Sequence, residues 1–246
     1  MTAAREALFR SCGWLIHLYT ASGAVTALIA LQFTVRGDFR AAFIVLAIAL
    51  FVDSTDGPLA RAIQIRKRIP RFDGATLDNI VDYLNYVAVP IFLMLRAELL
   101  PGGVAGLGVA SFAMIASCYG FSRVDAKTAD LYFRGFPSYW NLVAFYLFCC
   151  QLAPLISAMI VTTLAAMVFA PIKFIYPNRT VPLRRLTLGL CVIWAVVTLT
   201  LLFELPVRNP ILLYSSLAFI VYYFVTSLCL QIFAIARPET RRIVTS

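Results

Sequence analysis

Two short stretches decide both the fold and the chemistry: residues 52–61, VDSTDGPLAR, and residues 74–82, GATLDNIVD. In the first stretch, four residues fall at i, i+3, i+4 and i+7 and so share one face of a helix: Asp53, Asp56, Gly57 and Ala60. In the second, every fourth residue shares a face: Gly74, Asp78 and Asp82. A short basic loop joins the two stretches, so we expect antiparallel neighbouring helices whose four carboxylates converge.

The sequence around these stretches is that of a polytopic membrane protein. Of the 246 residues, 61% are hydrophobic and 13% are charged, whereas soluble domains carry roughly 25% charged residues. A spanning helix needs about 20 mostly apolar residues. We predict an all-α transmembrane helical bundle, one integral membrane domain over residues 1–246, with about eight spans: 14–35, 41–63, 74–95, 104–124, 138–153, 154–172, 187–205 and 211–233. The fifth and sixth are nearly continuous, with Pro154 as the expected turn, so seven spans is the alternative.

The positive charge has a topological explanation. The net charge of +9 comes from short basic clusters between apolar segments, which is typical of membrane topology and argues against a nucleic-acid partner. With eight spans, one side of the membrane receives nearly all of the lysines and arginines. The other side receives only a few: Arg36, Arg40, Arg96 and Arg208. By the positive-inside rule both termini and the carboxylates then lie on the cytoplasmic side.

Four aspartates at the membrane surface need a counter-charge. An Asp within a span costs about 2.5–3.5 kcal/mol on insertion scales, so four would cost on the order of 10–14 kcal/mol. Arg61 alone does not neutralise them, whereas hard divalent cations with oxygen ligands do. Carboxylates without His or Cys favour Mg²⁺ or Mn²⁺, and two such ions form a clamp for displacement at phosphorus. The alternatives are a proton relay, an ion pathway or a structural charge pair.

Small residues next to the aspartates leave room for a ligand. Gly57, Ala60 and Gly74 keep the two helix faces bare, so that a diphosphate can approach closely. Arg61 would then contact phosphate at the mouth of the site.

The same residues carry a family resemblance. The pattern Asp53-x2-Asp56-Gly57-x2-Ala60-Arg61, followed by Gly74-x3-Asp78-x3-Asp82, resembles the long and specific signature of the CDP-alcohol phosphotransferases. The resemblance implies that the aspartates hold two divalent metals and that Asp82 is the base that deprotonates the acceptor alcohol. It also implies that the Gly and Ala positions make room for the CDP moiety.

One departure from the common pattern points to a branch of that family. Residues 62–73 separate the two halves of the motif, a longer gap than most members have, and this resembles the bacterial phosphatidylcholine synthase branch. Residues 17–23, HLYTASG, and 133–141, FRGFPSYWN, resemble the same branch. The resemblance implies transfer of the phosphatidyl group of CDP-diacylglycerol to choline with release of CMP, in the bacterial inner membrane. Inositol, glycerol phosphate or serine as acceptor, and a cation transporter, are the alternatives; a homodimer is left open.

Residues outside the motif complete the predicted site. His17, with Thr20 and Ser22, is expected to form a wall of the CDP pocket, although a polar residue satisfied within its own helix is the simpler interpretation of His17. Choline is a quaternary ammonium that aromatic faces hold best. We expect a cage of four aromatic residues, which the aromatic belt of a membrane interface would explain as well: Tyr86, Tyr119, Tyr139 and Trp140. The six cysteines form no CxxC or Cys/His cluster and predict neither disulfides nor a zinc site.

Overall fold

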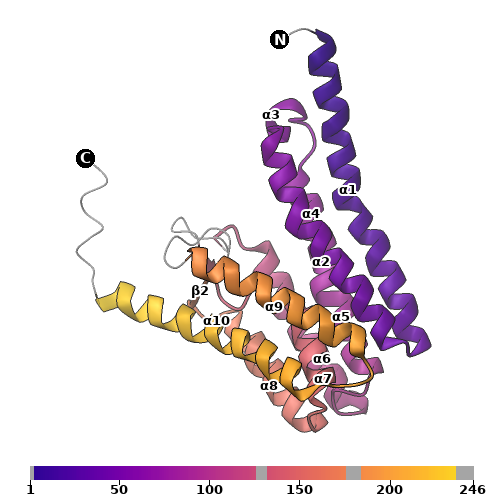
Figure 1. The fold of residues 1–246 in the computed structure, drawn as a ribbon, viewed down its shortest axis with the longest axis vertical. Helices are drawn as coiled ribbons and strands as arrows, with labels where there is room; N and C mark the ends of the chain where they lie inside the picture. The colour runs from indigo at the N-terminus through magenta and orange to yellow at the C-terminus, as the bar shows by residue number, and fades with distance from the viewer. Residues whose placement is uncertain (1–2, 126–131, 176–183, 237–246) are drawn as a thin grey trace. The chain divides into compact units, whose positions relative to one another are not determined.

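A computed structural model of the chain describes residues 3–125, 132–175 and 184–236, and it is almost wholly helical there (Figure 1). The chain divides into two compact units, each discontinuous in sequence. Unit 1 comprises Met1–Phe121 and Tyr139–Thr162, and unit 2 comprises Ser122–Ser138 and Thr163–Ser246. The predicted single domain over 1–246 stays a prediction.

Unit 1 is built around two long antiparallel helices, α1 (Ala3–Arg36) and α2 (Phe39–Ala62), which lie side by side (Figure 1). The turn between them is tight because Gly37 adopts a positive φ of 78°. Asp38 then caps α2 by accepting a hydrogen bond from the Ala41 amide at 3.0 Å. Helix α1 also packs on α3 (Ile65–Arg68) and on α4 (Gly74–Asp82), so it holds both halves of the motif.

The third predicted span is one helical run with a π-helical centre. Helix α4 passes without interruption into the π-helix η1 (Tyr83–Ala88) and then into α5 (Val89–Arg96). Both junction residues, Asp82 and Val89, have right-handed helical backbone angles. Single π-helical turns inside α-helices occur frequently at functional sites, and this one begins directly after the last aspartate of the motif.

The remaining helices of unit 1 are α6 (Gly103–Ser122) and α7 (Trp140–Cys150), and α8 (Pro154–Met167) runs from unit 1 into unit 2. Helix α7 ends at Cys150, and the next residue, Gln151, has a positive φ of 47°. Predicted segments 138–153 and 154–172 are therefore two separate helices, of 11 and 14 residues.

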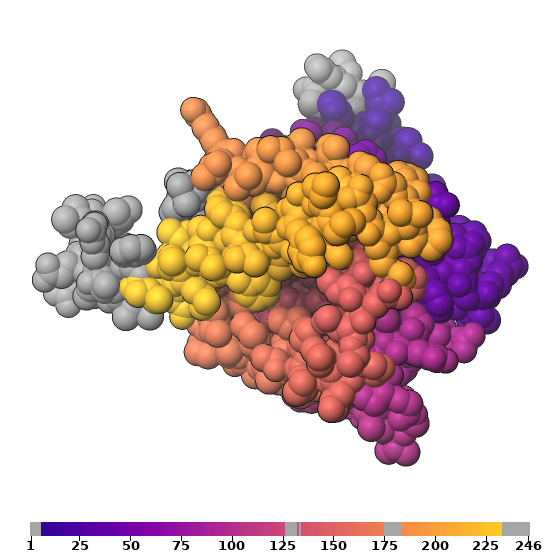
Figure 2. Space-filling model, turned by 60° about the horizontal axis from the view of Figure 1, so that its bottom comes forward, coloured from indigo at the N-terminus to yellow at the C-terminus, as the bar shows by residue number. Residues whose placement is uncertain are grey.

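Unit 2 contains α9 (Arg184–Glu204) and α10 (Pro210–Ala236), which lie side by side (Figures 1 and 2). It also contains a short antiparallel ribbon that the all-α prediction missed, β1 (Tyr132–Arg134) with β2 (Lys173–Ile175). Strands of three residues are too short to reveal an alternating pattern in sequence. Gly135 follows β1 with φ +82°, and a Cβ there would lie 2.3 Å from the carbonyl oxygen of Val168. Its place in the FRGFPSYWN stretch thus has a structural reason.

The chain is an integral membrane protein by the length and composition of its helices. Within the described residues, five helices are long and apolar enough to cross a membrane: Glu6–Arg36, Phe39–Ala62, Gly103–Ser122, Arg184–Glu204 and Pro210–Ile232. Large apolar side chains on their surfaces are exposed, among them Leu28 on α1, Ile193 on α9 and Ile211 on α10. This is the surface expected of helices that face lipid. The full count of eight spans and the cytoplasmic position of the termini stay predictions.

Candidate active site

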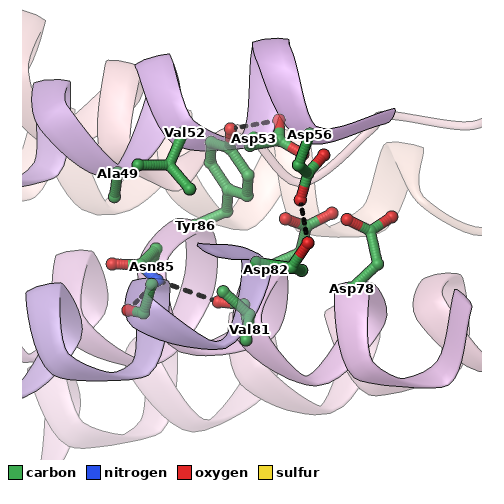
Figure 3. Close-up of a pocket in the computed structure, with 11 residues that line it drawn as sticks. Ala49, Val52, Asp53, Asp56, Asp78, Val81, Asp82, Asn85 and Tyr86 are labelled. Carbon is green, nitrogen blue, oxygen red and sulfur yellow. Dashed lines mark hydrogen bonds between the residues drawn. The ribbon is translucent and has the colours of Figure 1, made fainter. Parts of the chain in front are cut away.

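The predicted carboxylates meet between α2 and α4 (Figure 3). One oxygen each of Asp53, Asp78 and Asp82 lies within 4.8 Å of the others, and all three residues are half-buried. The fourth aspartate, Asp56, points toward the same space from α2. The helical spacing predicted four converging carboxylates, and the structure brings three of them within 4.8 Å of one another.

Asp56 is the most deeply buried of the four. Asp56 is only 4% exposed, and its Oδ2 accepts a hydrogen bond from the Thr20 hydroxyl of α1 at 2.7 Å. Asp53 has a similar partner, because the Tyr86 hydroxyl of η1 donates to its Oδ2 at 2.7 Å. Each α2 carboxylate is thus held by a hydroxyl from another helix.

A narrow cavity of about 10 Å³ lies at this meeting point, which is about the space that one water-sized particle occupies. Its walls come from α1, α2, α4 and η1. The lining residues are Thr20, Gly23, Ala49, Val52, Asp53, Asp56, Asp78, Val81, Asp82, Asn85 and Tyr86.

The donor set fits a hard divalent cation. Three carboxylates with ligand atoms within 4.8 Å repel one another when ionised, and a divalent cation among them removes that repulsion. Every charged donor is an oxygen, which is the set that Mg²⁺ and Mn²⁺ prefer over softer metals. Asp53, Asp78 and Asp82 would form the core of a metal site, with Asp56 beside them.

The start of α4 is fixed by Asp73, a residue that the sequence analysis did not single out. Its side chain caps the helix by accepting from the Ala75 amide at 3.0 Å, the Thr76 amide at 3.3 Å and the Thr76 hydroxyl at 2.8 Å. The Thr76 hydroxyl, helped by the two amides, lowers the pKa of Asp73 below its usual value. The Asp-x-x-Thr pattern before the helix was a signal that could have identified this cap.

The small motif residues have different surroundings. A Cβ at Gly57 would meet only the guanidinium of Arg61, at 3.2 Å, so the space beside Gly57 is open apart from a flexible side chain. A Cβ at Gly74 would instead lie 2.7 Å from Cε1 of His17. Ala60 is half-buried and Arg61 is exposed. The surface beside Gly57, Ala60 and Arg61 is therefore open, while Gly74 is covered by a protein side chain.

The three predicted pocket residues on α1 serve contacts within the protein. His17 is 7% exposed and packs on Phe72, with ring centroids 4.4 Å apart. Thr20 donates to Asp56, and the Ser22 hydroxyl donates to the Tyr19 carbonyl of its own helix at 2.6 Å. The structure thus brings Thr20 into the carboxylate site and places His17 against the start of α4.

The four predicted cage aromatics do not share one environment. The rings of Tyr86 and Tyr139 meet edge to face, with centroids 6.2 Å apart. Trp140 is fully buried, and its indole N–H donates to the Ser117 hydroxyl at 2.7 Å. Tyr119, on α6, is 46% exposed. The structure brings Tyr86 and Tyr139 together and places Trp140 in the core of unit 1.

Asn85 is the principal site residue that sequence reasoning missed. It is 3% exposed, and its Nδ2 donates to the Gly23 carbonyl at 2.8 Å and to the Val81 carbonyl at 3.0 Å. Its Oδ1 accepts from the Thr26 hydroxyl at 3.2 Å. Asn85 thereby ties η1 to α1 behind the carboxylates. The sequence signal for Asn85 was its amide side chain, which lies three residues after Asp82 in an otherwise apolar segment.

The long gap between the motif halves forms a basic elbow. Arg68 stacks over Phe9 of α1 at 4.1 Å and donates to the Ile63 carbonyl at 2.8 Å, so it anchors α3. Arg66 and Lys67 are exposed instead. A wide surface hollow of about 380 Å³ lies here, lined by Ala60, Arg61, Gln64, Ile65, Arg66 and Lys67.

Known proteins resemble this chain over the part of the sequence that forms the site. The sequence profile of the family described as CDP-alcohol phosphatidyltransferase matches residues 15–172, more than half of the chain and all of the site. The phosphatidylcholine synthase of Bradyrhizobium diazoefficiens is 39% identical over 77% of this chain and 71% of its own. That of Rhizobium meliloti is 34% identical over 89% of this chain and 90% of its own. That of Legionella pneumophila is 37% identical over 68% of this chain, a match that spans 65% of the relative's length.

Proposed function

Because the chain belongs to the CDP-alcohol phosphatidyltransferase family, we propose that it transfers the phosphatidyl group of CDP-diacylglycerol to choline and releases CMP. The observation that carries the proposal is the set of three carboxylates from two helices within 4.8 Å of one another. The choice of choline is supported by the relatives, which are phosphatidylcholine synthases from several bacteria.

The aspartates have two roles in the proposed reaction. Asp53, Asp56, Asp78 and Asp82 would hold two divalent cations, Mn²⁺ or Mg²⁺, which when bound supply charge stabilisation for the diphosphate. Asp82 accepts the hydroxyl proton of choline. The choline oxygen forms a bond to the phosphorus that carries diacylglycerol, the phosphorus–oxygen bond to CMP breaks, and the electron pair leaves with CMP.

The two substrates approach the carboxylates from different surroundings. The open faces of Gly57 and Ala60, with exposed Arg61 beside them, suit the CDP moiety. The edge-to-face pair of Tyr86 and Tyr139 lies on the Asp53 side and is the best-supported part of a choline cage. Tyr119 is the proposed exposed wall of that cage, and Trp140 supports it from the core.

The proposed setting is the bacterial inner membrane, with eight spans, both termini in the cytoplasm and the site facing the cytoplasm. The asymmetry of Lys and Arg between the two sides supports this orientation. The lipid chains of the substrate can then remain in the bilayer while the headgroup reacts at its surface.

Two ion pairs argue against an acceptor that carries phosphate. Such an acceptor needs a basic pocket, for which the sequence offers Arg123, Lys127 and Arg134. Arg123 and Arg134 both bond to Asp125, at 2.8 Å and 2.6 Å, and the hydrogen bond from Arg123 lowers the pKa of Asp125. Lys127 lies outside the described residues. Family membership likewise argues against the cation-transporter alternative.

A reconstituted assay tests the proposal. Purified protein receives CDP-diacylglycerol and Mn²⁺ with labelled choline, inositol, serine or glycerol phosphate. We expect CMP release and labelled lipid with choline. Labelled lipid from another acceptor would overturn the choline assignment, and absence of CMP release with every acceptor would overturn the reaction.

A further inference from the structure

The two carboxylates on α2 are each held by a hydroxyl group from a different part of the chain. The Tyr86 hydroxyl of η1 bonds to Asp53 Oδ2 at 2.7 Å, and the Thr20 hydroxyl of α1 bonds to Asp56 Oδ2 at 2.7 Å. The bond between Tyr86 and Asp53 is drawn as a dashed line in Figure 3. An ionised carboxylate only accepts hydrogen bonds, so both hydroxyls are the donors. Bonds of this length to a charged oxygen are among the stronger hydrogen bonds in proteins.

These contacts are shielded from solvent. Thr20 is 7% exposed, Asp56 is 4% exposed and Tyr86 is 6% exposed. Water therefore offers little competition for either hydroxyl, and each bond restricts the rotation of one carboxylate. One oxygen is turned toward the hydroxyl, and the remaining lone pairs are left to face the space between α2 and α4.

Both donors sit on backbone that is itself anchored. Asn85 precedes Tyr86 in the π-helix and bonds to the Gly23 carbonyl of α1 at 2.8 Å. Gly23 permits this close approach, because a Cβ there would lie 2.4 Å from a methyl group of Val81. The same α1–η1 contact therefore fixes the helices that carry Thr20 and Tyr86. The hydroxyls are presented from rigid elements rather than from loops.

We propose that Thr20 and Tyr86 are positioning residues that orient Asp56 and Asp53 for cation binding. The inference rests on the metal site of the proposed function. It assigns Thr20 to the carboxylate rather than to the nucleotide, and it gives the Tyr86 hydroxyl a task distinct from any contact of its ring with choline. Outer-sphere partners of this kind typically change metal affinity by 10- to 100-fold when they are removed.

The test measures Mn²⁺ binding directly, by electron paramagnetic resonance of free Mn²⁺ in titrations of the purified protein without substrates. Thr20→Val and Tyr86→Phe remove one hydroxyl each with little change in shape. We expect each to raise the Kd for Mn²⁺ by about 10- to 100-fold, and Thr20→Ser, which keeps a hydroxyl, to bind as the wild type does.

Two matched controls come from the same elements. Thr34→Val removes a buried hydroxyl of α1 that donates to the Ala30 carbonyl of its own helix, at 2.8 Å. Tyr83→Phe removes a hydroxyl of η1 that donates to the Met114 carbonyl at 3.2 Å. Both should leave the Kd for Mn²⁺ within about twofold of the wild-type value, given the precision of such titrations. Thermal unfolding without metal identifies any variant that is destabilised, and Thr20→Ala replaces Thr20→Val in that case.

The outcomes separate this inference from the function on which it rests. A wild-type protein that binds no Mn²⁺ would overturn the metal site itself. If the wild type binds Mn²⁺ and both Thr20→Val and Tyr86→Phe bind it equally tightly, the positioning role alone is overturned. Tyr86 would then act only through its ring. Loss of affinity in the controls as well would assign the effect to general packing and also overturn the inference.

Discussion

The ring of His17 occupies the space that a side chain at position 74 would need: a Cβ on Gly74 would lie 2.7 Å from His17 Cε1. His17 is held there by Phe72, whose ring centroid is 4.4 Å away, and by Trp14 at 5.9 Å. Helix α4 therefore begins against α1 at a distance that only glycine permits. The contact fixes the end of the helix that carries Asp78 and Asp82.

We predict that Gly74→Ala destabilises the protein by about 1–3 kcal/mol, the usual cost of overpacking. The added methyl group must displace the His17 ring or move α4 away from α1. Turnover should fall as well, because Asp78 and Asp82 move with the helix. Thermal unfolding of the detergent-solubilised protein, followed by circular dichroism, measures the first effect.

His17→Ala in the Gly74→Ala background is the control, since it removes the clashing ring. The double variant should be more stable than the sum of the stability losses caused by Gly74→Ala and His17→Ala alone predicts. If the losses are simply additive, His17 is not the obstacle and Gly74 is needed for another reason, such as the approach of the nucleotide.

The convergence of the aspartates was predictable because it follows from helical periodicity. Asp53 and Asp56 share a face of α2, Asp78 and Asp82 share a face of α4, and the short connection forces the helices together. The role of Gly74 was not predictable in the same way. Nothing local in sequence indicates that His17, more than fifty residues earlier, fills the space beside it.

Contacts between side chains that are distant in sequence explain the other features of the structure that the sequence did not predict. Thr20 and Asp56 are 36 positions apart, and Tyr86 and Asp53 are 33 apart, so neither bond leaves a periodic signal. The π-helix at Tyr83–Ala88 follows a sequence that fits an ordinary helix, and tertiary contacts such as the Asn85 bonds to α1 decide it. Trp140 lies beside Tyr139 in sequence, but neighbouring residues on a helix start do not face the same way, and only Tyr139 meets Tyr86.

The next prediction concerns the core of the metal site. Asp53→Asn and Asp78→Asn should each abolish detectable turnover, because each removes one of three negative charges within 4.8 Å. Excess chelator should have the same effect on the wild type, and added Mn²⁺ should reverse it. Turnover is measured as CMP released from CDP-diacylglycerol. Full activity after exhaustive chelation would contradict the metal requirement.

The proposed role of Asp82 as the general base gives it a second task beyond its charge. Asp82→Asn should still bind CDP-diacylglycerol but turn over about 10²–10⁴-fold more slowly, the usual contribution of a general base. Binding is measured by equilibrium dialysis with a labelled liponucleotide. A variant that keeps a tenth or more of the wild-type rate would place the base elsewhere.

The basic elbow offers a test of electrostatic attraction. Arg66 and Lys67 line the hollow next to Arg61 and are exposed, and each such charge near an anionic membrane surface contributes about 1 kcal/mol. Arg66→Gln with Lys67→Gln should raise the KM for the anionic liponucleotide at low salt, and the effect should shrink at high salt because salt screens exposed charges.

Arg68 provides the contrast for that prediction. Its guanidinium lies over Phe9 and bonds to the Ile63 carbonyl, so Arg68→Gln should lower thermal stability and show no comparable dependence of KM on salt. An unchanged KM for the Arg66 and Lys67 variant at low salt would leave these residues with a role in topology alone.

The last prediction concerns choline. Tyr139 is half-buried and meets the Tyr86 ring with centroids 6.2 Å apart, so its ring can offer a face to a quaternary ammonium near Asp53. A cation–π contact contributes roughly 0.5–2 kcal/mol, and 1.4 kcal/mol corresponds to a factor of ten. Tyr139→Leu should therefore lower kcat/KM for choline by about 2- to 30-fold and leave the KM for CDP-diacylglycerol nearly unchanged. Tyr139→Phe should be milder, because the ring and not the hydroxyl holds the cation.

Tyr119→Leu, at the exposed wall, should have a smaller effect than Tyr139→Leu. Trp140→Leu should chiefly lower stability, because the indole is fully buried and bonds to Ser117. If Tyr139→Leu and Tyr119→Leu both leave the kinetics of choline unchanged, the cation is bound by other residues, and this aromatic pair has only a packing role.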